Sequence, residues 1–245
     1  MARRSKGTVM DDDLFTDYHK IRNGEAVDLA VVKKLFHYYN NGLVFNIAQA
    51  ERCGIEIPAN EKEQMARNGL TRQSLEELAL LNSTNRVILS KTRNDFPYVN
   101  IMKQPKLENN YSATFDMAEV RDFGKTHIKS ILSHAKKVLV YDNYLSEKST
   151  LDRLLKEILP QKKLEIEYNA MPAKLLESLK RHCDKWTFTE RKDLKGYHDR
   201  YMIVDGEVEI IMTSGLDHLG ETTTDFTYIL RPIDEVRFNR YRKKA

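Results

Sequence analysis

The sequence predicts an α/β protein whose mainly parallel sheet acquires a late β-hairpin, preceded by a smaller, mainly helical domain. From about residue 115 onward, short apolar strand-like runs alternate with amphipathic helical runs, which is the pattern of βαβ crossovers. Near the end of the chain, Asp205-Gly206 stands between two apolar runs, and this dipeptide is a strong signal for a two-residue hairpin turn. The chain is therefore divided into a helical region with a linker, residues 1–112, and an α/β domain, residues 113–245.

The first 112 residues have the pattern of short helices followed by a linker. Apolar residues recur at helical spacing in residues 26–39 and in 43–53, and a further helix is expected to begin after Ser74, a good N-cap residue. Small helical bundles commonly pack or dimerise, so we expect a recognition or dimerisation unit. A helix-turn-helix that reads DNA through residues 82–93 is the alternative. Residues 94–112 carry prolines without clear periodicity, which predicts a linker.

The second half is expected to alternate helices and strands before it ends in the hairpin. The expected helices cover residues 116–135, 150–159 and 172–182. The expected strands cover residues 137–141, 163–168 and 186–189, and the hairpin joins residues 198–204 to 207–212. His127 and His134, seven residues apart on the first of these helices, are both expected to be packing residues. Ligands of open α/β sheets bind beyond the carboxyl ends of the strands, so we look for the site there.

Composition and charge set limits on the class of protein. Of the 245 residues, 41% are hydrophobic and 31% are charged, which excludes a disordered or fibrous protein. A net charge of +4 is too small to identify a nucleic-acid-binding protein by itself, although both ends of the chain are basic. The run Asp11-Asp12-Asp13 predicts a solvated acidic segment and no metal site.

Cysteine usage and hydropathy indicate the compartment. Cys53 and Cys183 are far apart, which excludes a disulfide framework and a cysteine-based zinc site and favours a reducing environment. No apolar run is long enough to span a bilayer, and the first residues have no apolar segment of the signal-peptide kind. We therefore expect a cytoplasmic protein with no membrane insertion, no metal and no cofactor.

The residues that carry chemistry gather around the hairpin. His198 and Arg200 are two apart on a strand and so project from the same face. Asp205 follows at the turn, and the hydroxyl pair Thr213 and Ser214 follows the returning strand. An imidazole can attack phosphorus or transfer protons, and a guanidinium can hold two phosphate oxygens. We expect the imidazole, the guanidinium and the carboxylate to meet at one sheet end as a phosphate-handling set.

Two further pairs of polar residues follow expected strands. Asp142 and Asn143 come directly after the strand at residues 137–141, where they could line the same cleft and contact substrate. A plain turn is the alternative for this pair. Asp217 and His218 lie in a loop bounded by glycines, for which an ordinary loop is the favoured interpretation and substrate contact the alternative. The sequence contains no glycine-rich phosphate loop and no H-E-x-x-H helix.

One segment resembles a known family. The stretch His198-Asp199-Arg200-Tyr201-Met202-Ile203-Val204-Asp205 resembles the phospholipase D superfamily signature, H-x-K-x4-D followed six residues later by G-S-x-N. The order of the preceding elements is similar to one half of that fold, and the resemblance covers about residues 115–235. The block that continues through Gly215-Leu216-Asp217-His218-Leu219-Gly220 looks closer to divergent members, found at the C-termini of phage-type regulators and of microtubule-interacting-and-trafficking domain proteins. Those relatives carry Arg in place of Lys, and some of them are binding modules.

The resemblance implies a fold and a set of roles. The fold is a phospholipase D-like mixed sheet flanked by helices. His198 would be the nucleophile that forms a phospho-histidine or the acid, Arg200 the phosphate grip and Asp205 the residue that orients the imidazole, while Thr213 falls at the family's Ser. Because the signature occurs once, the second imidazole of the family mechanism would have to come from a homodimer. Besides the Arg for Lys exchange, Met212 replaces the family's Gly, and its Asn is also replaced.

Two hypotheses about function follow. The first is a metal-independent phospholipase D-like phosphodiesterase that acts on nucleic acid as a homodimer, with nucleic acid favoured over lipid by the basic chain ends and Arg200. The second is a catalytically inactive module of the same fold that binds a phosphate-bearing ligand, nucleic acid or a protein partner, the last through the N-terminal helices. The exchange of Lys for Arg favours the second hypothesis, because Arg is bulkier and keeps its proton.

Overall fold

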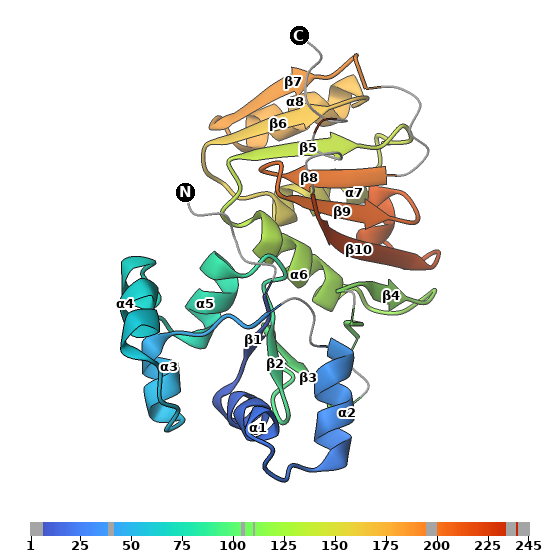
Figure 1. The fold of residues 1–245 in the computed structure, drawn as a ribbon. Helices are drawn as coiled ribbons and strands as arrows, with labels where there is room; N and C mark the ends of the chain where they lie inside the picture. Colours follow the sequence, from blue (N-terminus) through green and yellow to red (C-terminus); the bar gives the residue numbers. More distant parts are fainter. Residues whose placement is uncertain are drawn as a thin grey trace. The chain divides into compact units, whose positions relative to one another are not determined.

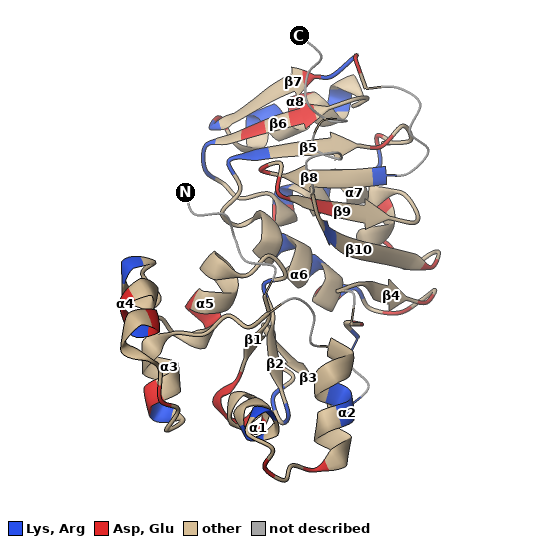
Figure 2. Ribbon diagram, viewed as in Figure 1, with Lys and Arg blue, Asp and Glu red and all other residues tan. Residues whose placement is uncertain are grey.

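The computed structural model describes residues 7–38, 42–103, 106–109, 111–194, 200–233 and Asn239. The chain divides into two compact units between residues 109 and 110 (Figure 1), where the sequence predicts a boundary between residues 112 and 113. Among the described residues, no helix combines the length and the apolar composition that crossing a bilayer requires. Basic and acidic residues are interspersed along both units (Figure 2).

The N-terminal unit contains a small sheet as well as helices. Its elements are β1 (Val9–Met10), α1 (Asp12–Arg22), α2 (Leu29–Tyr38), α3 (Ile47–Arg52), α4 (Ala59–Arg67), α5 (Leu75–Asn82), β2 (Ile88–Ser90) and β3 (Tyr98–Asn100). The three strands pair in parallel in the order β1-β2-β3. The expected N-cap is confirmed, since the Ser74 hydroxyl accepts from the Glu77 amide while the Glu77 carboxylate accepts from the Ser74 amide.

Three expectations for this unit are wrong. Residues 82–93 do not form a DNA-reading helix, because α5 ends at Asn82 and β2 follows it. The expected linker, residues 94–112, contains strand β3. The helix prediction fails because a short apolar run does not distinguish a buried strand from a buried helix. Only the pairing with β1 determines that residues 88–90 form a strand. The run Asp11-Asp12-Asp13 is not simply solvated, since Asp11 caps α1 by accepting from the Leu14 amide at 2.8 Å.

The C-terminal unit is an α/β domain with one mixed sheet of seven strands. Its elements are β4 (Ala113–Phe115), α6 (Asp122–Leu132), β5 (Lys137–Tyr141), α7 (Ser149–Ile158), β6 (Leu164–Tyr168), α8 (Ala173–His182), β7 (Trp186–Glu190), β8 (Arg200–Val204), β9 (Val208–Met212), the 3₁₀ helix η1 (Leu216–Leu219) and β10 (Phe226–Pro232). The strand order is β4-β10-β9-β8-β5-β6-β7, which Figure 1 shows from the lower to the upper edge of the sheet.

The sheet combines two patterns of pairing. Strands β5, β6 and β7 are parallel and are joined by α7 and α8, as the alternation of strands and helices predicts. The other four strands pair antiparallel, and β8 joins the two groups by pairing with β5. Helix α7 packs against both α6 and α8. The expected α/β fold with a mixed sheet flanked by helices is therefore confirmed.

Helix α6 is shorter than the sequence predicts. It begins at Asp122, because the chain turns after edge strand β4 (Ala113–Phe115) and Ala118 has a positive φ of 67°, which is incompatible with a helix. His127 is fully buried in α6, and its Nδ1 lies 2.6 Å from the Tyr228 hydroxyl oxygen of β10. The predicted packing role of His127 is confirmed, and the contact fixes α6 on the sheet. The same prediction is wrong for His134, which is exposed and lies beyond the end of α6 at Leu132.

The late hairpin forms where the sequence predicts it. Asp205 and Gly206 both have positive φ, 52° and 70°, and the Glu207 amide donates to the Val204 carbonyl oxygen at 2.9 Å. The register pairs Val204 with Val208, so three residues connect the strands where the dipeptide predicts two. The Asp205 carboxylate accepts from the backbone amides of Lys136 at 2.8 Å and Lys137 at 2.9 Å. The turn is thereby held against the first residue of β5.

Strand directions define the two ends of this sheet. At one of these ends five strands terminate, namely β5, β6, β7, β9 and β4, and the other two strands, β8 and β10, begin there. We call this end of the strands the Arg200 edge, after the first residue of β8. The hairpin turn lies at the opposite edge.

Candidate functional site

Arg200 is the centre of the candidate site. It stands opposite Met212 in the β8–β9 register, and its side chain extends toward the segment that follows β5. Its Nε lies 3.7 Å from Oδ1 of Asp142, and Nη1 is 3.5 Å from the carbonyl oxygen of Thr213. The guanidinium carbon lies 5.0 Å from the centre of the Tyr144 ring, which is within the range of a cation–π contact. One cation therefore joins the ends of three chain segments.

Asp142 is the carboxylate that holds this cation. Its residue is only 1% exposed. Its Oδ1 accepts from the backbone amide of Tyr144 at 2.8 Å, and its Oδ2 accepts from the backbone amide of Leu216 at 3.2 Å. A buried carboxylate with both oxygens fixed is a rigid anion in a medium that screens charge weakly, so it can orient the guanidinium beside it.

The guanidinium of Arg200 retains hydrogen-bonding capacity. Its side chain is 25% exposed, and Nε is buried without a hydrogen-bond partner among the described residues. Arg191, which follows β7 at the same edge, provides a contrast. Its guanidinium bonds Glu167 at 2.9 Å and both carboxylate oxygens of Asp193 at 2.8 Å. Arg191 is thus engaged within the fold, whereas Arg200 is held at Nε by Asp142 and leaves a quarter of its side chain exposed to a ligand.

The two hydroxyls predicted to contact substrate lie at the Arg200 edge but are engaged with β10. The Thr213 hydroxyl lies 3.3 Å from the carbonyl oxygen of Thr227 and accepts from the amide of that residue at 3.1 Å. The Ser214 hydroxyl donates to the carbonyl oxygen of Asp225 at 3.2 Å. Both side chains therefore connect the end of β9 to the start of β10, and a ligand would have to compete with these contacts.

Asn143 lies at the same edge in a small amide network. Its Oδ1 accepts from Nδ2 of Asn169 at 2.6 Å, and the Oδ1 of Asn169 in turn accepts from the Asp142 amide at 3.0 Å. Asn169 follows β6, the parallel neighbour of β5, so the carboxyl-end rule could have indicated it from the sequence. The network fixes the segment that carries Asp142.

The expected meeting of His198, Arg200 and Asp205 is corrected in one respect. Asp205 lies one strand length from Arg200, about 16 Å at 3.3 Å per residue, and its carboxylate binds the backbone at the start of β5. The expectation fails because a hairpin strand carries its turn away from its starting end. Asp142 takes the place beside Arg200 that the sequence reading gave to Asp205. His198 lies outside the described residues.

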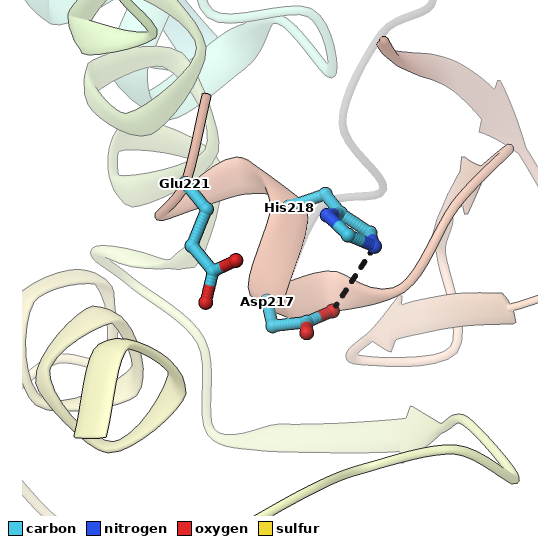
Figure 3. Close-up of side chains that lie close together, drawn as sticks. All are labelled: Asp217, His218 and Glu221. Atoms are coloured by element: carbon cyan, nitrogen blue, oxygen red, sulfur yellow. Dashed lines mark ion pairs between the residues drawn. The ribbon is translucent and has the colours of Figure 1, made fainter. Parts of the chain in front are cut away.

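A second polar cluster lies on η1 and the residues after it. Figure 3 shows Asp217, His218 and Glu221, whose possible metal-ligand atoms all lie within 4.8 Å of one another. Nζ of Lys148 lies 2.7 Å from Asp217 and 3.6 Å from Glu221, and the hydrogen bond to Asp217 raises the pKa of this ammonium group above its usual value. Because an ammonium already lies against both carboxylates, the cluster is an ion-pair network that ties the start of α7 to η1.

Gly215, between β9 and η1, lies against a charged side chain. A Cβ atom on Gly215 would come within 2.4 Å of Oδ1 of Asp217. No side chain fits there unless the carboxylate moves away. The backbone itself does not require glycine, since φ of Gly215 is −55°, so the constraint is the Asp217 carboxylate, which Lys148 binds at 2.7 Å.

Comparison with known proteins gives matches among solved structures only. No protein-family model matches the sequence, and no curated protein matches it. NucT from Helicobacter pylori is 13% identical over 49% of this chain and 84% of its own, with a TM-score of 0.32. Nuc from Salmonella typhimurium, described as a phospholipase D family member, is 12% identical over 54% of this chain and 99% of its own, with a TM-score of 0.30.

A third match extends over more of the chain. TrmBL2, described as an archaeal chromatin protein with a novel mode of DNA binding, is 15% identical over 84% of this chain and 64% of its own, with a TM-score of 0.27. At these TM-scores the three matches describe what the chain is similar to and carry no argument about its chemistry. The functional argument rests on the residues of the Arg200 edge.

Proposed function

We propose that the C-terminal unit is a phosphodiesterase that acts on nucleic acid, with the phosphodiester bound at the Arg200 edge. The observation that carries the proposal is a guanidinium held beside the buried carboxylate of Asp142 on a side chain that is 25% exposed, so an anion can reach it. A guanidinium matches two phosphate oxygens at once, and its charge persists at every physiological pH. The basic chain ends favour a polyanionic substrate.

The proposed chemistry uses imidazole as the nucleophile. His198, two residues before Arg200 in the sequence, attacks phosphorus while Arg200 holds the non-bridging oxygens. The bond from phosphorus to the leaving oxygen breaks, and water then attacks the phospho-histidine to release the product and the free imidazole. A second His198, across a homodimer interface, supplies the proton that the leaving oxygen requires. The two isolated cysteines are in keeping with a cytoplasmic setting.

Two substitutions test this proposal. Purified protein is assayed on labelled single-stranded and duplex DNA and RNA in the presence of EDTA, since an imidazole nucleophile needs no metal. We expect His198→Ala to lower the rate by about a thousandfold or more, because the nucleophile is lost, and Arg200→Ala to lower it by about a hundredfold. Arg200→Lys, which restores the family's cation, is the matched control and should retain part of the rate. Equal rates for wild type and His198→Ala would refute the proposed phosphodiesterase mechanism.

The second candidate function is binding without cleavage. It is favoured by the hydroxyls of Thr213 and Ser214, which are engaged with backbone carbonyls of Thr227 in β10 and of Asp225 just before it. A module of this kind would hold nucleic acid or another phosphate-bearing ligand through Arg200, while the N-terminal helices contact a protein partner. Affinity would then fall in Arg200→Ala and stay unchanged in His198→Ala. A His198-dependent hydrolysis rate would exclude this candidate.

A further inference from the structure

Tyr144 is a large aromatic side chain that the fold leaves in solvent. It is 70% exposed, and among the described residues its hydroxyl makes no hydrogen bond. A single exposed apolar side chain needs no explanation by itself. The position of this one is unusual, because its ring lies 5.0 Å from the guanidinium carbon of Arg200, the proposed phosphate grip.

The same carboxylate positions the ring and the cation. Oδ1 of Asp142 accepts from the backbone amide of Tyr144 at 2.8 Å and faces Nε of Arg200 at 3.7 Å. Asp142 is in turn tied to Asn169 and to η1 through its amide and its second oxygen. The buried carboxylate of Asp142 therefore fixes the position of the aromatic ring relative to the guanidinium. Packing of a surface side chain alone would not require such an arrangement.

A flat ring beside a phosphate grip matches one repeating feature of nucleic acids. Every phosphate is flanked by bases whose faces stack on aromatic side chains, and this stacking is tolerant of sequence. In a duplex those faces are covered by neighbouring base pairs, whereas in a single strand they are available. Building on the proposed function, we propose that Tyr144 stacks on an unpaired base next to the phosphate held by Arg200, so that the substrate class is single-stranded nucleic acid.

The placement of the other exposed apolar side chains argues against a lipid surface. Within the described part of the C-terminal unit, Met117 and Val120 are the other large apolar side chains that are exposed, and both follow β4. Four strand spacings, about 19 Å, separate β4 from β5, and the ends of β8, β9 and β10 with their polar side chains lie between them. A membrane-binding face needs contiguous apolar area. Tyr144 instead has a cation as its neighbour.

Binding of short labelled oligonucleotides tests the inference. Affinities are measured by fluorescence anisotropy for a single strand, for its duplex, and for a strand of equal length with abasic sites at its centre. We expect Tyr144→Ala to weaken single-strand binding about 5- to 150-fold and to leave duplex and abasic binding unchanged. Tyr144→Phe, which keeps the ring, should bind as wild type, and Tyr144→Leu should bind as the alanine variant. Phe36→Ala, which removes an exposed ring from the N-terminal unit, is the control and should change nothing.

The outcomes separate this inference from the function it builds on. If Arg200→Ala weakens binding of all three ligands while Tyr144→Ala changes none of them, the proposed function stands and the stacking role is wrong. If neither wild type nor any variant binds nucleic acid, both proposals are refuted. Sedimentation with anionic phospholipid vesicles that requires Tyr144 would also overturn the inference, because it would assign the ring to a membrane surface. Folding of the Tyr144 and Arg200 variants is checked through Trp186, the single tryptophan of the chain, and folding of Phe36→Ala by circular dichroism.

Discussion

Replacing Asp205 by alanine separates a structural role of this carboxylate from a catalytic one. Its oxygen accepts from two backbone amides, at 2.8 and 2.9 Å, and these bonds hold the hairpin turn to the start of β5. A hydrogen bond to a charged group contributes about 1.5–3 kcal/mol, and the lower end applies because this turn is partly exposed. Alanine would also have to adopt a φ of 52°, at a cost of about 1 kcal/mol. We therefore expect Asp205→Ala to lower the free energy of unfolding by about 3–4 kcal/mol.

The assay for this prediction uses the chain's own fluorophore. Trp186 is the single tryptophan and is buried in β7, so its fluorescence during urea unfolding reports on the C-terminal unit. Asp205→Asn is the matched control, because it keeps a side-chain oxygen and tolerates positive φ, and we expect it to lose about 1 kcal/mol or less. Per folded molecule, the affinity of Asp205→Ala for phosphodiester ligands should equal that of wild type. Unchanged stability together with abolished activity would show that Asp205 orients the imidazole after all.

Three further predictions concern the residues around the site and the N-terminal unit. Asp142→Asn should lower the free energy of unfolding by about 2 kcal/mol and weaken phosphate binding, because Arg200 loses its counter-charge. Binding is measured by titration with inorganic phosphate, and an unchanged affinity would contradict this prediction. Gly215→Ala should lower the stability by about 1–3 kcal/mol, because its Cβ meets Asp217, and a thermal melt followed by Trp186 fluorescence that matches wild type would show that the loop can shift. Ser74→Ala should cost about 1 kcal/mol in stability by removing the capping box of α5, measured by circular dichroism, and Ser74→Thr should recover most of it.

The N-terminal unit shows where local patterns are insufficient. Its capping signal at Ser74 was readable because a cap involves residues that are neighbours in the chain. Strand β2 was not readable, because its apolar residues have no periodicity that separates strand from helix. Its state follows from parallel pairing with β1, about eighty residues earlier in the chain, and with β3. A sequence window cannot contain such a partner.

At the site, residue types and turn chemistry were accessible from the sequence, whereas the pairing of charges was not. Arg200 was identified from its spacing and resemblance, and the Asp205-Gly206 turn from its dipeptide, since both signals are local. That Asp142 and not Asp205 accompanies Arg200 depends on β8 lying antiparallel to β5, which sets the end of one strand beside the start of the other. Burial of Asp142 and exposure of Tyr144 are likewise properties of the assembled sheet edge. Local propensity specifies turns and helices, but which charges share a low-dielectric environment is decided by contacts between distant segments, and these exist only once the sheet has formed.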